Sequence, residues 1–344
     1  MEQRKVMSLG RSSLVISLPK DWVKLTKLKQ GDVVSIEVQR NRSLTVFPRF
    51  EGKRQERKIT LYIDPNESQD SIARSIIACY LNGYSTIRLA SRKIFSTVQQ
   101  KAIRRIAGTL YMRIMESDAK NVQIVDLIDE SKASIVSGVH RMHVIASSMC
   151  RDACSSLRDQ NAALARAVYS LDEDVDRFCF VLLRLLRSTA IDPALATQLD
   201  LDPIDCLDYQ TVVYRIEHVA DQAANIAKHI VMLGGEQRKI PDSLVNLMFV
   251  SCSEVVESYD KAVESFFSKD VTSCNEVIEQ QKKTEKLDQE IASKSFLHPQ
   301  MNAMTICAVC SIRDSIKRIS EWAATMAENT IVRSYEQRFL ESRH

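Results

Sequence analysis

The stretch "YRIEHVADQAANIAKHI", residues 214–230, lies in a long amphipathic segment and carries two acids at helical spacing. Glu217 and Asp221 are four residues apart, so they share one face of a helix. The stretch "SLDEDVDRF", residues 170–178, places Asp172 and Asp176 at the same spacing. Like charges at this spacing destabilise an isolated helix by about 0.2–0.5 kcal/mol, so two such pairs on neighbouring helices call for a compensating cation.

The four carboxylates of Asp172, Asp176, Glu217 and Asp221 are therefore candidate metal ligands. Hard oxygen ligands suit Mg, Mn, Ca and oxidised iron. An acidic face that stays solvated and holds no specific ion is the alternative interpretation of the same residues.

Outward from these stretches, the chain from about Lys132 to its end consists of long amphipathic segments with few helix breakers. Two halves of three helices each are expected, about residues 131–236 and 240–335 within a domain 131–344, which makes a pair of antiparallel bundles. The breaks that suggest about six helices lie near Asp192-Pro193, Asp202-Pro203, Gly234-Gly235, Lys269-Asp270 and His298-Pro299.

Residues 217–228, "EHVADQAANIAK", resemble the helix motif E-R-I-G-D-H-A-x-N-I-A-E of the PhoU family of phosphate uptake regulators. Glu217, Asp221 and Asn225 stand at matching positions, whereas His218 and Gln222 replace the motif's Arg and His. The resemblance covers about residues 132–335 and implies two tandem three-helix bundles. It also implies that the acids on the first bundle, with Asp172 and Asp176 from the companion helix, hold a divalent or ferric ion such as Mg, Mn, Zn or Fe.

The second half matches this motif less well. In "KRISEWAATMAE", residues 317–328, Lys317 replaces the first acid, Glu321 the Asp and Thr325 the Asn. The companion helix keeps Asp288 but has Thr284 four residues earlier. Because a lysine among the remaining acids supplies a cation itself, the second bundle is predicted to be metal-free.

The pattern of residues 57–130 predicts a small α/β module. Ile59, Leu61 and Ile63 alternate with polar residues, as in a half-buried strand. A helix is expected over residues 71–81, ending at Asn82-Gly83. A strand "STIRLA", a helix "STVQQKAIRRIAG" and the strands "TLYMRIM" and "NVQIVDLI" then follow.

The N-terminal residues are basic and form short alternating runs. Residues 1–58 contain fourteen Lys or Arg and six acids, whereas the remaining chain is slightly acidic, with 33 Lys or Arg and 38 acids. The runs "KVMSL", "SLVISLP", "VVSIEVQ" and "SLTVFP" predict strands, and "KDWVKLTKL" predicts a short helix after Pro19. A small β-rich head is expected.

Residues 3–48 resemble the AbrB/SpoVT/MazE family of swapped-hairpin DNA-binding domains. The resemblance lies in a basic first strand, Gly10, a second strand that ends in Leu18-Pro19-Lys20, a short helix and then Gln30-Gly31-Asp32. It implies that residues 1–50 of two chains interleave into one β-barrel, since one short β unit cannot cover its apolar face. A homodimer is therefore expected.

The resemblance implies that this dimer binds double-stranded DNA. Cations that face phosphates would release condensed counterions and give salt-dependent affinity. A head that only dimerises or binds a partner is the alternative. The candidate DNA-binding residues are Arg4, Lys5, Arg11, Ser12, Lys20, Lys24, Lys27 and Lys29.

The cysteine and histidine residues do not predict a further metal site or a catalytic site. Nine scattered cysteines suit a reducing compartment, so no disulfide is expected. Cys307 and Cys310 form an isolated C-x-x-C in an apolar stretch and are interpreted as core residues. His140 and His143 are interpreted as packing or surface residues rather than ligands.

The sequence has no run that approaches the roughly 18 apolar residues of a membrane span, and the start does not resemble a secretory signal. We therefore expect a cytoplasmic protein without membrane insertion. Phosphate-binding loops, the nucleophile elbow and the zinc-protease motif are absent, so we do not expect an enzyme. A metal-dependent phosphoesterase is the enzymatic alternative.

Taken together, the sequence predicts a multidomain, mainly α-helical protein that resembles archaeal fusions of an AbrB-like head with a PhoU-like body. Such a protein would regulate transcription of phosphate uptake genes. The alternative is an accessory protein that docks on a phosphate ABC transporter or a sensor kinase without binding DNA.

Overall fold

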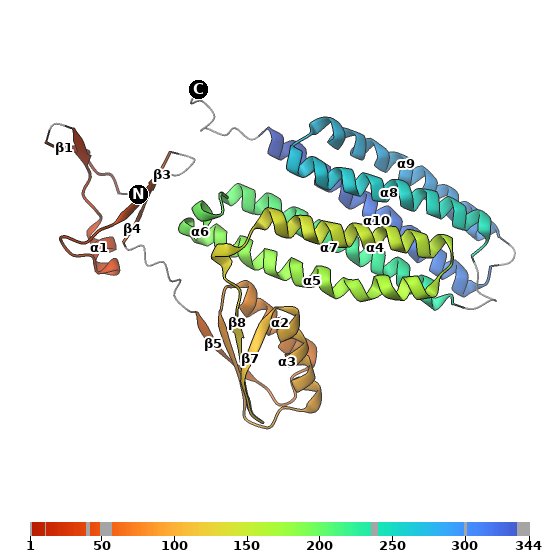
Figure 1. Cartoon of the computed structure of the whole chain (residues 1–344), viewed down its shortest axis with the longest axis horizontal. Helices are drawn as coiled ribbons and strands as arrows, with labels where there is room; N and C mark the ends of the chain where they lie inside the picture. Colours follow the sequence, from red (N-terminus) through yellow and green to blue (C-terminus); the bar gives the residue numbers. More distant parts are fainter. Residues whose placement is uncertain are drawn as a thin grey trace. The chain divides into compact units, whose positions relative to one another are not determined.

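The computed structural model describes residues 2–10, 12–38, 42–48, 57–234, 240–298 and 301–335. The chain divides into two compact units (Figure 1). The first comprises Met1–Gln55 with Gln337–His344, and the second comprises Glu56–Glu336.

The head contains two short β-hairpins and one helix. Strands β1 (Met7–Leu9) and β2 (Ser13–Val15) pair antiparallel, as do β3 (Ser35–Val38) and β4 (Leu44–Phe47). Helix α1 (Lys20–Thr26) lies between them in sequence and ends at Lys27, which adopts the left-handed conformation. Among the described residues of a single chain, these strands close no barrel. The barrel expected from two interleaved chains stays a prediction.

The second unit begins with an α/β module whose element order is the one expected. Its sheet has the order β5-β6-β8-β7, with β5 and β6 parallel and the other neighbours antiparallel. Helices α2 and α3 cover one face of the sheet (Figure 1). The elements are β5 (Lys58–Ile63), α2 (Gln69–Leu81), β6 (Thr86–Ser91), α3 (Thr97–Thr109), β7 (Met112–Ser117) and β8 (Asn121–Asp126).

Local signals explain the module's helices. Ser68 and Ser96 cap α2 and α3, and Ser96 forms a capping box with Gln99. After α2, Gly83 has a φ of 81°, which a side chain would disfavour. The helices and strands share an apolar core that includes Ile72, Ile76, Tyr80, Ile87, Leu89, Ile103 and Ile124.

The helical body contains six long helices and one short one in the described residues, which confirms a mainly α-helical fold. A 3₁₀ turn (Glu130–Lys132) leads into it. None of its helices has an apolar stretch able to cross a bilayer, judged over the described residues. The helices are α4 (Ile135–Arg158), α5 (Ala162–Ile191), α6 (Pro193–Gln198), α7 (Pro203–Met232), α8 (Asp242–Ser268), α9 (Val271–Leu297) and α10 (Ala303–Ser334).

Polar caps set most of the helix boundaries. Asp192 and Asp202 cap α6 and α7, which have Pro193 and Pro203 at their first turns. The two Asp-Pro breaks therefore flank the short α6. The sequence analysis did not predict the break between α4 and α5, because no Gly or Pro marks it. Asn161 caps α5 at this break.

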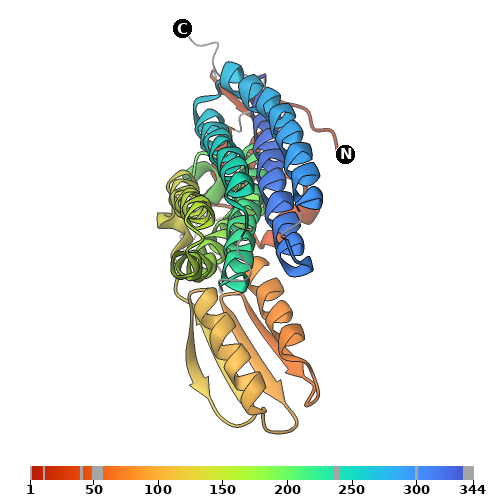
Figure 2. The ribbon, with the colours of Figure 1, turned by 90° about the vertical axis from the view of Figure 1, so that its right-hand side faces the viewer.

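Helices α4, α5 and α7 pack together, as do α8, α9 and α10, while α4 also contacts α8 and α7 contacts α10. The two sets lie side by side in both views (Figures 1 and 2) and bury one continuous apolar core. Helices α4 and α5 approach closely at Gly138, where an added Cβ would lie 2.6 Å from Cδ2 of Leu182.

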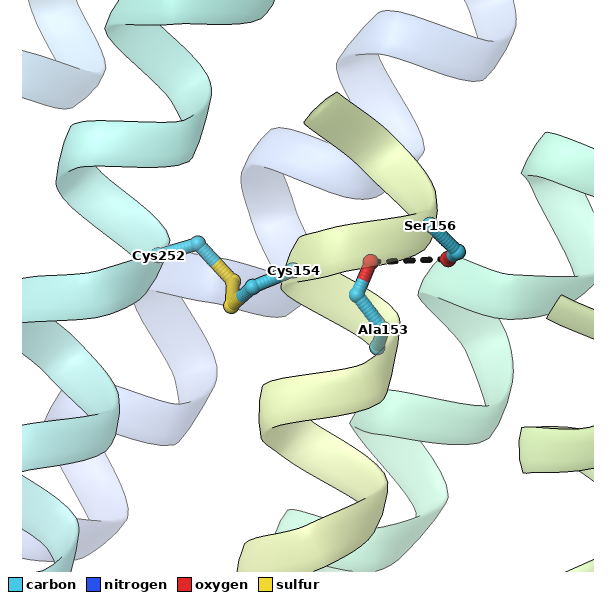
Figure 3. The surroundings of a disulfide bond; sticks show 4 residues. All are labelled: Ala153, Cys154, Ser156 and Cys252. Carbon is cyan, nitrogen blue, oxygen red and sulfur yellow. Dashed lines mark hydrogen bonds between the residues drawn. A yellow bond between two sulfur atoms is a disulfide. The ribbon is translucent and has the colours of Figure 1, made fainter. Parts of the chain in front are cut away.

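Two expectations about cysteine were wrong. Cys154 of α4 and Cys252 of α8 form a disulfide between the two sets of helices (Figure 3). They are 98 residues apart in sequence, and both are buried. Cys307 is exposed rather than in the core, because Thr305, Ala308, Val309 and Ile312 form the buried stripe of α10.

Candidate functional site

The first candidate site lies where α5 packs against α7. Val175 and Cys179 are buried on α5, and Ile216 and Ala220 are buried on α7, so the acids between them project beside the interface. Asp172, Asp176 and Glu217 are half-buried, and Asp221 is exposed.

Electrostatic coupling shows that the four acids lie near one another. The pKa of Glu217 is raised to about 7, first by burial and then by the negative charges of Asp221, Asp176 and Asp172. Burial also raises the pKa of the other three carboxyls. Asp221 adds to the rise at Asp176, and Asp172 adds to that at Asp221. The structure thus places the two pairs within electrostatic reach of each other, but of the four acids only Glu217 and Asp221 belong to a group of close ligand atoms among the described residues.

His218 adds a nitrogen atom to this cluster. One ligand atom each from Glu217, His218 and Asp221 lies within 4.8 Å of the others. Burial lowers the pKa of His218, which keeps the imidazole neutral and free to use a ring nitrogen as a ligand. The ring packs beside Trp322 of α10, at 4.9 Å between centroids. Sequence reasoning missed this residue, because neighbours in a helix point in different directions.

Among the described residues, no Lys or Arg lowers the pKa of any of the four acids. Arg177, one residue beyond Asp176, pairs instead with Glu173 and Asp174. The buried Oε2 of Glu217 lies 2.6 Å from Nδ1 of His218 but takes part in no hydrogen bond of acceptable geometry. An orphaned carboxylate oxygen among mutually repelling acids fits the donor set of a hard metal ion.

In the second bundle, cationic side chains lie beside the acids. Asp288 lies 3.0 Å from Nε of Arg313, and Lys317 lies 3.7 Å from Glu321. Burial raises the pKa of Asp288, while Arg313 and Lys317 oppose that rise. Thr284 is buried and donates its hydroxyl to Gln280 O. Lys317 was identified from the sequence, whereas Arg313, four residues before it, was not.

The neighbouring positions of the first bundle serve packing. Asn225 donates to the hydroxyl of Ser315 on α10 at 2.8 Å, so it is not directed at the acids. His140 stacks on Phe267 at 4.0 Å. His143 lies 3.6 Å from Asp260 across the contact between α4 and α8.

The candidate DNA-binding residues lie on the head, whose described residues form no buried core. None of the described residues among 2–48 is buried. All seven described cationic or hydroxyl candidates are exposed, and Arg11 lies outside the described residues. Arg4 pairs with Glu2 and donates to Ser17 at 3.2 Å. The exposed apolar side chains include Val6, Leu9, Leu14, Ile16, Leu25, Val33, Ile36, Val38 and Leu44.

Comparison with known proteins adds two family matches. The PhoU domain model matches residues 139–230 and 252–330. The model of antidote-toxin recognition MazE, a bacterial antitoxin, matches residues 8–56. No curated protein matches the chain.

Two solved structures resemble the chain. PhoU from Pseudomonas aeruginosa has 17% identity and a TM-score of 0.51, with 58% of this chain and 95% of that chain covered. The phosphate transport system regulatory protein PhoU from Streptococcus pneumoniae has 10% identity and a TM-score of 0.46, with coverages of 59% and 95%. At this identity the first likeness concerns the fold alone.

Proposed function

We propose, from the premise that this chain carries two PhoU domains behind a MazE-like N-terminal domain, that it regulates phosphate uptake as a DNA-binding homodimer of the archaeal fusion type. The helical body would sense the signal, and the paired heads would bind duplex DNA. One observation carries the proposal. The head exposes both its apolar side chains and its cations, which is how half of an intertwined domain looks on its own.

The apolar surface supports the dimer. The relative solvent-accessible surface of Leu14, Ile36 and Val38 is 74%, 63% and 68%, respectively. Isolated two-stranded hairpins are at best marginally stable in water. A second copy of the head supplies a complementary apolar face, because each chain brings the same strands.

The cations support the DNA contact. Lys20 and Lys24 lie on α1, and Lys27 and Lys29 follow it directly. Together with Arg4, Lys5, Arg11 and Ser12 they would contact phosphates of the duplex. Each neutralised phosphate releases condensed counterions, so affinity should fall steeply with salt.

We further propose that Asp172, Asp176, Glu217 and Asp221 hold a divalent or ferric ion on the first bundle. His218 would contribute a nitrogen ligand. The ion would offset two or three of the four negative charges, whose mutual repulsion no Lys or Arg of the described residues relieves. The second bundle would stay metal-free, because Lys317 stands at the position of Glu217 and Arg313 lies 3.0 Å from Asp288. A phosphate ABC transporter or a signalling protein would be the partner that delivers the signal.

The experiment measures mass and DNA binding on the full chain. Sedimentation should give a dimer, and Ile36→Asp should give a monomer because it places a charge on the shared apolar face. Ile94→Asp is the matched control, since Ile94 is 68% exposed in the α/β module. A dimer that persists in Ile36→Asp contradicts the proposed interface.

DNA binding is then measured with mixed-sequence duplex fragments. The wild-type protein should bind with an affinity that decreases linearly in a log-log plot against salt. The Ile36→Asp monomer should bind much more weakly. A wild-type protein that fails to bind duplex, or binds without salt dependence, rejects the proposed function in favour of a head that only dimerises.

A further inference from the structure

Residues 71–115 of the α/β module contain eight Lys or Arg and no Asp or Glu. The chain as a whole holds 44 acids in 344 residues, about one in eight, so a gap of this length is unusual for this protein. All eight cations are exposed: Arg74, Arg88, Arg92, Lys93, Lys101, Arg104, Arg105 and Arg113. The second unit thus carries exposed cations on α2, β6, α3, β7 and the loop before α3, and the head's charge does not account for them.

The cations are most concentrated on α3. Lys101, Arg104 and Arg105 have the spacing that places them on one helix face, and all three are exposed. Gly108 continues this stripe, and a Cβ built there would meet no atom within 4 Å, so the stripe is open. The opposite face of α3 packs into the module through Ala102, Ile103, Ile106 and Ala107.

Among the residues that the structure describes, Lys101, Arg104 and Arg105 form no ion pair with an acid. Lys101 and Arg105 are like charges four residues apart, an arrangement that destabilises a helix unless an anion is near. Two acids near the end of the module have ion pairs with other cations. Asp126 pairs with Arg184 of α5, and Asp129 with Lys132.

The chain just before α3 adds to the same charge. Arg92 and Lys93 are exposed in the connection from β6. The Ser96–Gln99 capping box fixes the start of the helix that follows. The α3 face, defined as Arg92, Lys93, Lys101, Arg104 and Arg105, is therefore a run of cations on an ordered loop and helix.

We propose that the α3 face is a second contact surface for duplex DNA. Three of its five cations are arginines, whose planar guanidinium matches the oxygens of a phosphate. An anionic membrane is the less suitable polyanion, because a helix that binds a bilayer inserts an apolar face. The apolar face of α3 is buried against its own module.

This inference rests on the proposed function, since it adds phosphate contacts to a chain whose head already binds duplex. The test uses three variants of the full chain. The α3 variant is K101A/R104A/R105A, and the head variant is K20A/K24A/K27A. The control variant, K282A/K283A/K286A, removes three exposed cations from α9, where Glu279, Glu285 and Glu290 surround them.

Dissociation constants for mixed-sequence duplex are measured over a range of salt. The slope of log affinity against log salt should become shallower in the α3 variant by about 0.9 for each lost contact, up to about 3 per chain. The control variant should keep the wild-type slope. An α3 variant that matches the control, while the head variant loses slope, overturns the inference and leaves the proposed function intact. A head variant with the wild-type slope, beside a weakened α3 variant, contradicts the proposed function instead.

An experiment with lipid vesicles distinguishes DNA from an anionic membrane as the ligand of the α3 face. Wild type and the α3 variant are sedimented with vesicles that contain anionic phospholipid. Vesicle binding that the α3 variant loses, with an unchanged DNA slope, overturns the proposal in favour of a membrane surface. The substituted side chains are exposed and alanine favours helix, so circular dichroism should be unchanged. Should the triple substitution unfold, R104Q/R105Q gives the same comparison with a loss of about 2 in slope.

Discussion

The pKa of Glu217 lies close to physiological pH, so this residue changes the charge of the helical body in that range. Its carboxyl has an ordinary pKa of 4.5 and a pKa of about 7 in the fold. Burial is the first cause, and three neighbouring acids add to it. A metal ion reverses this situation, because it stabilises the deprotonated ligands. The same side chain therefore makes the metal-free protein sensitive to pH, and under the proposed function it would also make the protein responsive to metal.

The metal-free protein is expected to lose stability as pH rises. Between pH 4.5 and about 7 the folded state keeps a proton on Glu217 that the unfolded chain has released. The free energy of unfolding therefore falls as pH rises through this window, by at most about 3 kcal/mol from this residue. Thermal midpoints measured across the window should decrease, and Glu217→Gln should flatten the decrease.

Two comparisons make this prediction decisive. Glu257→Gln on α8 should leave the pH dependence unchanged, because Glu257 is exposed and is not among the charges that raise the pKa of the four acids. Added Mn²⁺ should raise the midpoint of the wild type most at the upper end of the window. A Glu217→Gln protein with the full wild-type pH dependence and metal response contradicts the assigned role.

Arg313 is the corresponding residue of the second bundle. Arg313→Ala removes the cation that lies 3.0 Å from the largely buried Asp288. We expect a loss of roughly 1–3 kcal/mol in the free energy of unfolding, because a charge left without its partner is costly. Arg318→Ala, which breaks the exposed pair with Asp314, should cost clearly less, because solvent screens an exposed ion pair. Equal midpoints of urea denaturation for the two variants would refute this difference.

At the scale of elements, Arg184 connects α5 to the α/β module. Its buried guanidinium lies 2.7 Å from Asp126 and 2.9 Å from Glu130. It also donates to Tyr80 O and Tyr84 O, just where α2 ends. One side chain thus satisfies two acids and the carbonyl oxygens of a helix terminus. These contacts join α5 to the end of α2 and to the chain that follows β8.

Arg184→Met should destabilise the chain strongly. The variant removes the buried cation that lies 2.7 Å from Asp126, at a cost of about 3–5 kcal/mol in the free energy of unfolding. The exposed Arg187, which donates to Leu81 O and Asn82, is the control. Arg187→Ala should cost about 1 kcal/mol. Urea denaturation of both variants checks the ranking, and an Arg184→Met protein as stable as Arg187→Ala would show that the buried ion pairs add nothing net.

At the scale of the whole molecule, the two halves of the helical body form one structure. Asp260 of α8 accepts a hydrogen bond from Ser147 of α4 at 2.7 Å and pairs with Arg151. The Cys154–Cys252 disulfide joins the same two helices. A signal received on the first bundle would therefore pass through packed and covalent contacts to the second.

The disulfide should stabilise this arrangement in oxidised protein. Closing a loop of 98 residues limits the unfolded chain, and the entropic gain is at most about 4.7 kcal/mol. C154A/C252A should therefore have a lower thermal midpoint than the wild type without reductant. With reductant the two midpoints should converge. C307S/C310S should behave as the wild type, since neither residue is in the disulfide. Intact mass should show the loss of two hydrogens, and its absence in oxidised protein contradicts the bond.

The sequence by itself determined the elements and the pairs of acids. Periodicity predicted the α/β module and the helical body, because amphipathic patterns and caps such as Asp202 act over a few residues. Helical spacing placed Glu217 with Asp221 and Asp172 with Asp176, since four residues make about one turn. The replacement of an acid by Lys317 likewise predicted that the second bundle differs from the first.

Only the tertiary structure decided which distant residues meet. Cys154 pairs with Cys252, Arg313 meets Asp288, and Arg184 reaches the module, across separations that no local pattern encodes. Burial is also a property of the packed chain. It decides that Cys307 is exposed and that the pKa of Glu217 is raised to about 7. Spacing along a helix sets the direction of a side chain, whereas its neighbours, and therefore its charge, depend on what the other helices bring to it.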